Sequence, residues 1–136
     1  MIRKELQEVC TQYDELADKY FQAAKTIPVE ELVDLYSSGA FVDNTLVQSV
    51  FKKYQALNIE SLLQQETVLH QKIEDFAADL SQEEMELLAP VVSKMAKITN
   101  ILVAKVNIFD KVLDKIIKAC KQMLGEQENL DDRDLL

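Results

Sequence analysis

His70 is the only histidine in the chain, and it lies between two glutamates at helical spacing. Glu66, His70 and Glu74 recur at steps of four, so they share one face of a helix. Two carboxylates and an imidazole can bind a metal ion, but a carboxylate-bridged site in a helical bundle needs two Glu-x-x-His motifs and further glutamates. The chain has no such motif. We therefore expect no metal site, and we interpret His70 as a surface residue.

The other residue types that carry chemistry also lack partners in the sequence. Cys10 and Cys120 lie far apart, with no CxxC and no Cys/His cluster, and both fall on apolar stripes. This predicts inert thiols and neither a disulfide nor a zinc site. No histidine lies in a nucleophile context, and the phosphate-binding patterns GxGxxG and GxxxxGK[S/T] are absent. We expect no enzyme activity, no catalytic residue and no cofactor.

The composition favours helices in a single domain. A chain of 136 residues suits one domain with its own core. It has two glycines and two prolines, too few for the turns of a β-sandwich or barrel. The formal net charge of -9 argues against binding to nucleic acid or to an anionic membrane surface. The N-terminus lacks the apolar core of a signal peptide, and no run of eighteen uncharged apolar residues occurs, so we expect a cytoplasmic protein without membrane insertion.

Apolar residues at steps of three and four predict a succession of helices. The predicted segments are 2–24, 29–36, 46–57 and 59–80, followed by a long last helix. Their predicted ends and caps are Pro28, Gly39, Asp43 or Asn44, Asn58, and the capping box of Ser81 with Glu84. We therefore predict an all-α, single-domain bundle of four to six helices over residues 1–125.

The last helix has the broadest apolar surface. Its central line is spaced by seven residues and consists of Met95, Leu102, Phe109, Ile116 and Met123. Pro90 predicts a kink or a break between a short helix and this long one. Ile101, Val103, Ile108 and Ile117 extend the apolar surface further round the helix. A helix that is apolar on so many sides is either central in its own bundle or covered by a partner.

Charge is distributed unevenly along the C-terminal part of the chain. Residues 91–124 carry seven lysines and two acids, whereas residues 125–136 carry one arginine and five acids. Most of these lysines fall on the arc opposite the apolar line, where a solvated face is the general rule. Such a basic helix can pack among the protein's own acidic helices, which the sequence favours. The alternative is that it presents a basic groove to an acidic partner helix.

The C-terminal residues are predicted to form a tail. Gly125 is the expected end of the last helix, and residues 126–136 are expected to be a disordered acidic segment. Its apolar anchors for a partner are Leu130, Leu135 and Leu136. The ending DDRDLL also matches the acidic dileucine pattern that sorting adaptors read, a match that six residues reach easily by chance.

In size, acidity and helicity the chain resembles the broad class of adaptors and secretion or flagellar-export chaperones. We predict a non-catalytic protein–protein interaction module that makes a helix-in-groove contact with another protein. The candidate protein-binding residues are Ile101, Val103, Ile108, Ile117, Leu130, Leu135 and Leu136. The alternative is a structural or regulatory subunit that self-associates as a homo-oligomer. A helical enzyme or metal-binding bundle is the third reading.

Overall fold

The computed structural model describes the backbone of residues 2–135 and the side chains of residues 2–124. This part of the chain is all-α and contains no β-strand. Its helices are α1 (Lys4–Thr26), α2 (Val29–Ser38), α3 (Asn44–Ala56), α4 (Ile59–Phe76) and α5 (Gln82–Leu135), with short 3-10 turns η1 (Ala40–Val42) and η2 (Ala77–Asp79). The predicted class, an all-α bundle of four to six helices with a long C-terminal helix, is confirmed.

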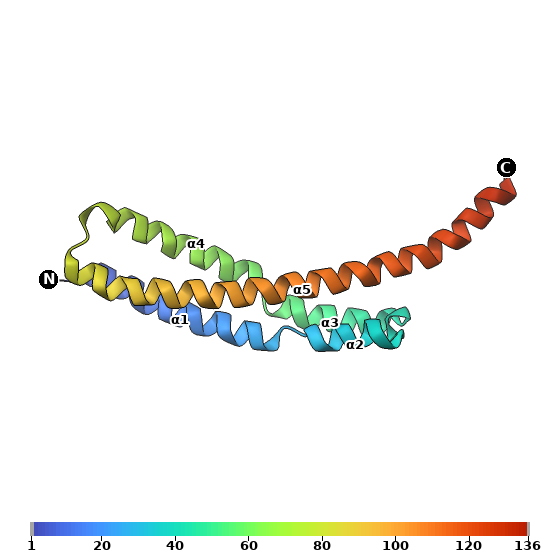
Figure 1. Ribbon diagram of the computed structural model, residues 1–136, viewed down its shortest axis with the longest axis horizontal. Helices are drawn as coiled ribbons and strands as arrows, with labels where there is room; N and C mark the ends of the chain where they lie inside the picture. Colours follow the sequence, from blue (N-terminus) through green and yellow to red (C-terminus); the bar gives the residue numbers. More distant parts are fainter. Residues whose placement is uncertain (1, 136) are drawn as a thin grey trace.

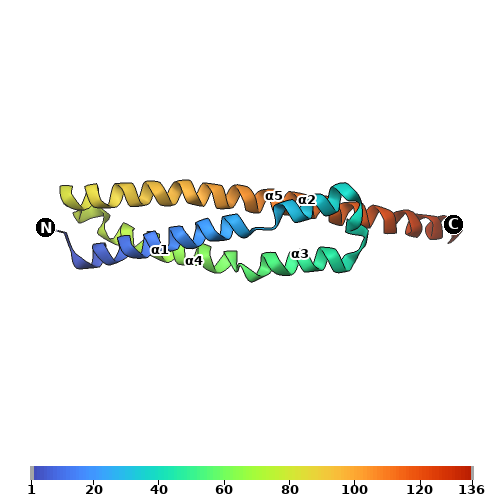
Figure 2. The same cartoon turned by 90° about the horizontal axis from the view of Figure 1, so that it is seen from below.

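The helices form an elongated rod in which three lines of helices lie side by side, parallel or antiparallel to one another. Figure 1 shows α1 and α2 following one another along the rod, α3 and α4 returning beside them, and α5 running the whole length. At one end α1 packs against both α4 and α5, and at the other α2 packs against α3 and α5. Figure 2 gives the same arrangement from below, with α5 projecting beyond α2 and α3. The molecule is therefore two short three-helix bundles that share α5.

Two of the three lines are interrupted at about the same level of the rod (Figure 2). Between α1 and α2, Pro28 has no N–H to continue the helix and restricts the residue before it. Between α3 and α4, Asn58 adopts a left-handed conformation with φ 51°. Asparagine tolerates this conformation better than most residues because its short polar side chain bonds locally. The break predicted at Asn58 is confirmed, although its side chain makes no capping hydrogen bond.

The remaining turns follow the predicted capping chemistry. Gly39 ends α2 with φ 78°, a conformation that favours glycine. Asp43, rather than Asn44, caps α3, since its Oδ1 accepts a hydrogen bond from the Thr45 N–H at 3.0 Å. The Ser81–Glu84 capping box is complete: the Glu84 N–H donates to Ser81 Oγ at 3.2 Å, and the Ser81 N–H donates to Glu84 Oε1 at 3.1 Å.

Glu84 also joins the start of the chain to the start of α5. The Arg3 guanidinium donates from Nε to Glu84 Oε2 at 2.9 Å and from Nη2 to Glu84 Oε1 at 3.2 Å. Nη2 also donates to the Asp79 carbonyl, and the guanidinium lies 4.8 Å from the centre of the Phe76 ring. The cation and the capping bonds hold the pKa of the Glu84 carboxyl at about 2. This cluster fastens α1 to the turn between α4 and α5.

Two predicted breaks in the last helix are absent. Of the kink or break expected at Pro90, the break is wrong, because α5 is one helix from Gln82 onward. Pro90 and Glu86 are both exposed, so the Glu86 carbonyl that loses its helical partner lies on the solvent side. The expected end at Gly125 is also absent, since the helix continues to Leu135. A glycine inside a helix costs only about 1 kcal/mol relative to alanine, which flanking helix formers offset.

The core follows the predicted line of α5 for most of its length. Met95, Leu102, Phe109 and Ile116 are all buried, which confirms this part of the line. Met123 is exposed instead, so the line leaves the core after Ile116. Residues of α1 form the other large share of the core, namely Leu6, Val9, Cys10, Tyr13, Leu16, Ala17, Tyr20, Ala23 and Ala24.

Candidate functional site

The histidine–glutamate arc of α4 does not form a site. His70 is exposed, with Nε2 3.6 Å from Glu74 Oε1. Glu66 points the other way and accepts hydrogen bonds from the Tyr20 hydroxyl at 2.7 Å and from Thr99 Oγ1 at 3.0 Å. Within residues 2–124, no group of three His, Cys, Asp or Glu side chains is placed to hold a metal ion. His70 and Glu74 therefore lie on the exposed surface, whereas Glu66 contacts the neighbouring helices.

The Glu66 cluster is a structural link between three helices. Tyr20 of α1 is fully buried, Glu66 belongs to α4 and Thr99 to α5. The Tyr20 hydroxyl also lies 3.1 Å from the Leu62 carbonyl. Burial, followed by the hydrogen bond to Glu66, raises the pKa of Tyr20 far above its usual range, so the phenol stays neutral and remains a donor. This arrangement positions the three helices relative to one another.

The two cysteines occupy different environments. Cys10 is buried in the small cluster around Leu6 and Leu88, and burial together with the Asp14 charge raises the pKa of its thiol. A thiol that stays protonated is a poor nucleophile, which agrees with the predicted inert role. Cys120 is only partly buried and lines a surface groove.

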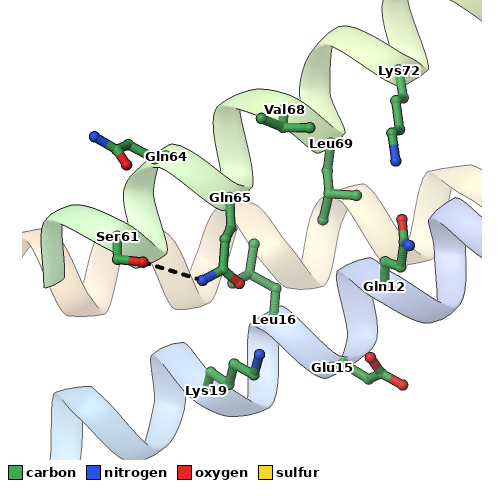
Figure 3. Close-up of a pocket in the computed structure, with 10 residues that line it drawn as sticks. All are labelled: Gln12, Glu15, Leu16, Lys19, Ser61, Gln64, Gln65, Val68, Leu69 and Lys72. Carbon is green, nitrogen blue, oxygen red and sulfur yellow. Dashed lines mark hydrogen bonds between the residues drawn. The ribbon is translucent and has the colours of Figure 1, made fainter. Parts of the chain in front are cut away.

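A groove between α1 and α4 is lined for the most part by polar and charged residues (Figure 3). Leu16 and Leu69 lie at the contact between the two helices, and Gln65 Nε2 donates to Ser61 Oγ at 3.5 Å. The remaining lining is Gln12, Glu15, Lys19, Gln64, Val68 and Lys72. Long, flexible polar side chains line this groove, and ordering them opposes binding of an apolar partner.

A second groove, between α3 and α5, is mainly apolar. Its walls carry Phe41, Val47 and Phe51 on the η1–α3 side, and Leu113, Ile116, Ile117, Cys120 and Leu124 on the α5 side. Polar atoms enter at the rim from Asn44, Gln48 and Lys121. The groove encloses about 310 Å³, at the small end of pockets that hold ligands. We call it the α3–α5 groove.

The groove exists because α3 and α5 meet closely at only one end of α3. There Tyr54 stacks on Phe109 with ring centroids 4.2 Å apart, and Val47 and Val50 are buried in the same core. Toward the start of α3, α5 runs apart from α2 and α3 (Figure 1), and apolar residues of α5 from Leu113 to Leu124 line the opening between them. An exposed apolar surface of this kind is a candidate for contact with another protein segment.

The four predicted binding residues within the described side chains are exposed, and they lie on two flanks of α5. Ile101, Val103, Ile108 and Ile117 are each between 40% and 49% exposed. Residues seven apart lie on one side of a helix, so Ile101 and Ile108 share one flank, while Val103 and Ile117 share the opposite one. Of the four, Ile117 alone lines the α3–α5 groove. The side chains of Leu130, Leu135 and Leu136 lie outside the described residues.

The opposite groove wall was not predicted from the sequence. Phe41 and Phe51 face the α5 residues of the groove, but their spacing reads as ordinary core. The sequence does place two phenylalanines close together, Phe41 in η1 and Phe51 in α3, with only Asp43 between the two elements. This pair is the feature that could have indicated a second apolar wall beside α5.

α5 is also the longest apolar helix of the described part. Within Gln82–Leu124 it contains one stretch that is long and apolar enough, by length and composition, to cross a membrane, and 17% of that stretch is buried. This stretch includes lysine, and the sequence has no run of eighteen uncharged apolar residues. The core helix of a helical bundle meets the same criterion when it is mostly buried; in this stretch Leu88, Met95 and Leu102 are buried, and the other side chains are partly or fully exposed.

Comparison of the chain with protein-family models, with curated proteins and with solved structures gave no match.

Proposed function

We propose that the protein is a non-catalytic protein–protein interaction module, of the adaptor or secretion/flagellar-export chaperone type, and that the α3–α5 groove is its docking surface. The observation that carries this proposal is the apolar lining of the groove, with Ile117 and Leu124 on one wall and Phe41 and Phe51 on the other. Aromatic and aliphatic side chains around a small hollow are the usual anchors of a helix-in-groove contact.

The shape of the groove also supports a helical segment over a small molecule. The α5 residues that line it extend from Leu113 to Leu124, which corresponds to roughly 17 Å, or three helical turns. Among residues 2–124, Lys121 is the one charged residue that lines it. A long, shallow apolar surface with few polar groups suits the apolar face of a helix, whereas a substrate site needs several convergent polar groups.

A second candidate function is self-association, and one observation favours it. Ile101 and Ile108 are exposed on the flank of α5 opposite Val103 and Ile117. Ile108 borders a hollow beside Lys105 and Pro28, at the level where α1 ends and α2 begins. Two copies that pair along this flank would leave the α3–α5 groove free, so self-association and docking are separable.

Site-specific cross-linking tests the docking proposal. Benzoylphenylalanine replaces Ile117 in the full chain, expressed in its own cell, and replaces Val68 of the α1–α4 groove in the matched control. We expect a defined protein to cross-link at position 117 and not at 68. The purified partner should then bind Ile117→Asp at least about tenfold more weakly than the wild type, as expected for a central apolar anchor.

Controls for that experiment use the same two positions. Val68→Asp should leave the affinity unchanged, and circular dichroism should show equal helix content in both variants. Cross-links at 117 that contain only this chain would replace the docking proposal by self-association, and equal loss of affinity in both variants would exclude the groove as the binding surface.

A further inference from the structure

One face of the N-terminal half of α5 is apolar and exposed. Five exposed side chains lie on it at helical spacing, and we call them the N-terminal face of α5: Met85, Ala89, Val92, Ala96 and Val103. Met85 is 45% exposed, and Val92 and Val103 are each 40% exposed. Figure 2 shows this half of α5 along one edge of the rod, with no other helix outside it. Apolar surface is therefore left open to solvent over about five helical turns.

The N-terminal face of α5 borders α4. Thr99 lies seven residues from Val92 and four from Val103, so it belongs to the same side of α5. Its hydroxyl donates to Glu66 of α4 at 3.0 Å, which places α4 next to this side. On α4, Leu63 lies about one turn from Glu66 and is 39% exposed. A helix that lies on the N-terminal face therefore contacts α5 and α4 together.

Charged residues are confined to the other sides of α5 over this length. Six occur between residues 82 and 107, and at 100° a residue each lies about 90° or more from the centre of the N-terminal face. Lys94 turns toward α1, where its Nζ lies 3.5 Å from Asp14 Oδ1. Charged residues make up 29% of the chain, so an uncharged exposed face of this length differs from an ordinary solvated surface. The centre of a homodimer interface is apolar and depleted of charge in the same way.

The spacing of the larger residues on this face is the same in either direction along the helix. Met85, Val92, Ala96 and Val103 follow one another at steps of seven, four and seven. In an antiparallel pair about a two-fold axis beside residue 94, Val92 of each copy meets Ala96 of the other, and Met85 meets Val103. A larger side chain then faces a smaller one at each position, which lets two helices interdigitate. A two-fold interface requires such self-complementarity, since one patch serves both copies.

We propose that the N-terminal face of α5 is a homodimer interface, in which α5 of a second copy lies antiparallel beside α4 and α5. The overlap from Met85 to Val103 is about 27 Å long. The interface uses the flank of α5 opposite Ile101 and Ile108. It goes beyond the docking function proposed above and does not depend on it, because the α5 residues of the α3–α5 groove begin only at Leu113. The dimer carries its two grooves open, at opposite ends.

Charges at the edge of the face favour the antiparallel direction. Glu86 and Lys97 are both exposed and lie eleven residues apart, hence on one side of α5. In the antiparallel pair, Glu86 of each copy lies within about two helical turns of Lys97 of the other, close enough for electrostatic attraction. A parallel pair places each of these residues beside its own counterpart, where like charges repel.

Two other occupants fit the N-terminal face less well than a second copy. A bilayer is opposed by Lys94 and Lys97, which interrupt the apolar residues of this part of α5. A different protein is commonly selected through complementary charges, and this face offers none. A second copy needs only the symmetry that the face already has.

The mass of the full-length protein in solution tests the interface. Sedimentation equilibrium from about 1 to about 100 µM should show a monomer–dimer equilibrium, as expected for a small apolar interface. Val92→Glu places one charge from each copy in the interface and should raise the dissociation constant of the dimer at least about tenfold. Ile108→Glu, the same charge at a 47% exposed position of the opposite flank, should raise it less than about threefold. Circular dichroism should show equal helix content in both variants.

Cysteine variants test the antiparallel direction in a Cys120→Ser background, which leaves the buried Cys10 as the one native thiol. A mixture of the Met85→Cys and Val103→Cys chains should form a mixed disulfide under mild oxidation. Neither chain alone should form a disulfide at a comparable rate, because each position lies about 27 Å from its own counterpart in the antiparallel pair. This test does not disrupt the interface, so it decides the inference even if Val92→Glu prevents folding.

Three results would each overturn the inference. The first is a protein that stays monomeric over the whole concentration range. The second is dissociation by Ile108→Glu and not by Val92→Glu, which would move the interface to the flank of Ile101 and Ile108. The third is a disulfide formed by the Met85→Cys chain alone as fast as by the mixture, which would require a parallel pair. Cross-linking at position 117 tests the α3–α5 groove separately from all three.

Discussion

Single side chains connect helices that lie far apart in the sequence. The Tyr20 hydroxyl and Thr99 Oγ1 both bond to Glu66, so one carboxylate joins α1, α4 and α5. At the level of the helix breaks, Lys105 Nζ donates to the Ala24 carbonyl at 2.9 Å and satisfies an acceptor in the last turn of α1. Each contact is polar, directional and partly or fully shielded from solvent. Such contacts fix the register of helices whose apolar faces alone allow sliding.

Phe109 is expected to be a main contributor to stability. It is fully buried and stacks on Tyr54, so Phe109→Ala removes apolar contacts and one aromatic pair. We expect the free energy of unfolding to fall by about 3–5 kcal/mol. Urea denaturation measures it. Ile108→Ala, an exposed neighbour on the same helix, is the control and should change it by less than about 0.5 kcal/mol. Similar losses for both would mean that the exposed flank of α5 is covered in solution.

The Arg3–Glu84 pair predicts a dependence of stability on pH. The pKa of Glu84 in the folded protein is about 2, below its ordinary value of 4.5, so the unfolded state binds more protons in this range. The stabilisation from this carboxylate is therefore complete above about pH 4.5 and is lost as the pH falls toward 2. Urea melts between pH 6 and 2 should show a smaller decline in Glu84→Gln. Arg3→Gln should also flatten the decline, and an unchanged slope in both variants would contradict the assignment.

At the scale of elements, the interruptions of the first two lines depend on single residues. Asn58 has φ 51°, which costs most side chains about 1–2 kcal/mol. Asn58→Ala should therefore lower the free energy of unfolding by about that amount, whereas Asn58→Gly should change it by less than about 1 kcal/mol. Thermal melts followed by circular dichroism compare the two. If alanine were tolerated as well as glycine, α3 and α4 would have to form one continuous helix in solution.

Local sequence signals predicted most elements, and long-range contacts account for what they missed. The helix ends near Pro28, Gly39 and Asn58 follow from the conformational limits of those residues, which act within a turn. The capping box at Ser81 is equally local. The break expected at Pro90 is absent, because the effect of a proline depends on whether the carbonyl that it frees faces solvent, which the sequence does not reveal. The Arg3–Glu84 pair spans 81 residues and has no signature along the chain.

The candidate site was predicted in part for the same reason. Ile117 stands out because it widens the apolar surface of α5 beyond what a core line needs, and it lines the groove. Phe41 and Phe51 do not stand out, since aromatic residues at helical spacing usually belong to a core. Only the packing of α3 on α5 shows that these rings are the second wall.

At the scale of the whole molecule, the bundle should be independent of the last residues of the chain. The described core ends at Ile116, and residues 126–136 follow it by more than two helical turns. A chain that stops at Gly125 should therefore melt within about 4 °C of the full-length protein. Thermal melts at several protein concentrations measure this. A larger loss would show that residues 126–136 bury surface, and a dependence on concentration would place that surface on a second copy.

The unbroken α5 also gives the rod a mechanical character. Its 54 residues span roughly 80 Å, and at the level of Pro28 and Asn58 it is the one line of the three that crosses without interruption. The bending stiffness of the rod at that level is therefore close to that of a single helix. Bending at this level moves α2 and α3 together relative to α1 and α4, and the C-terminal end of α5 moves with them. A partner held between α3 and the end of α5 would clamp that joint and stiffen the whole rod.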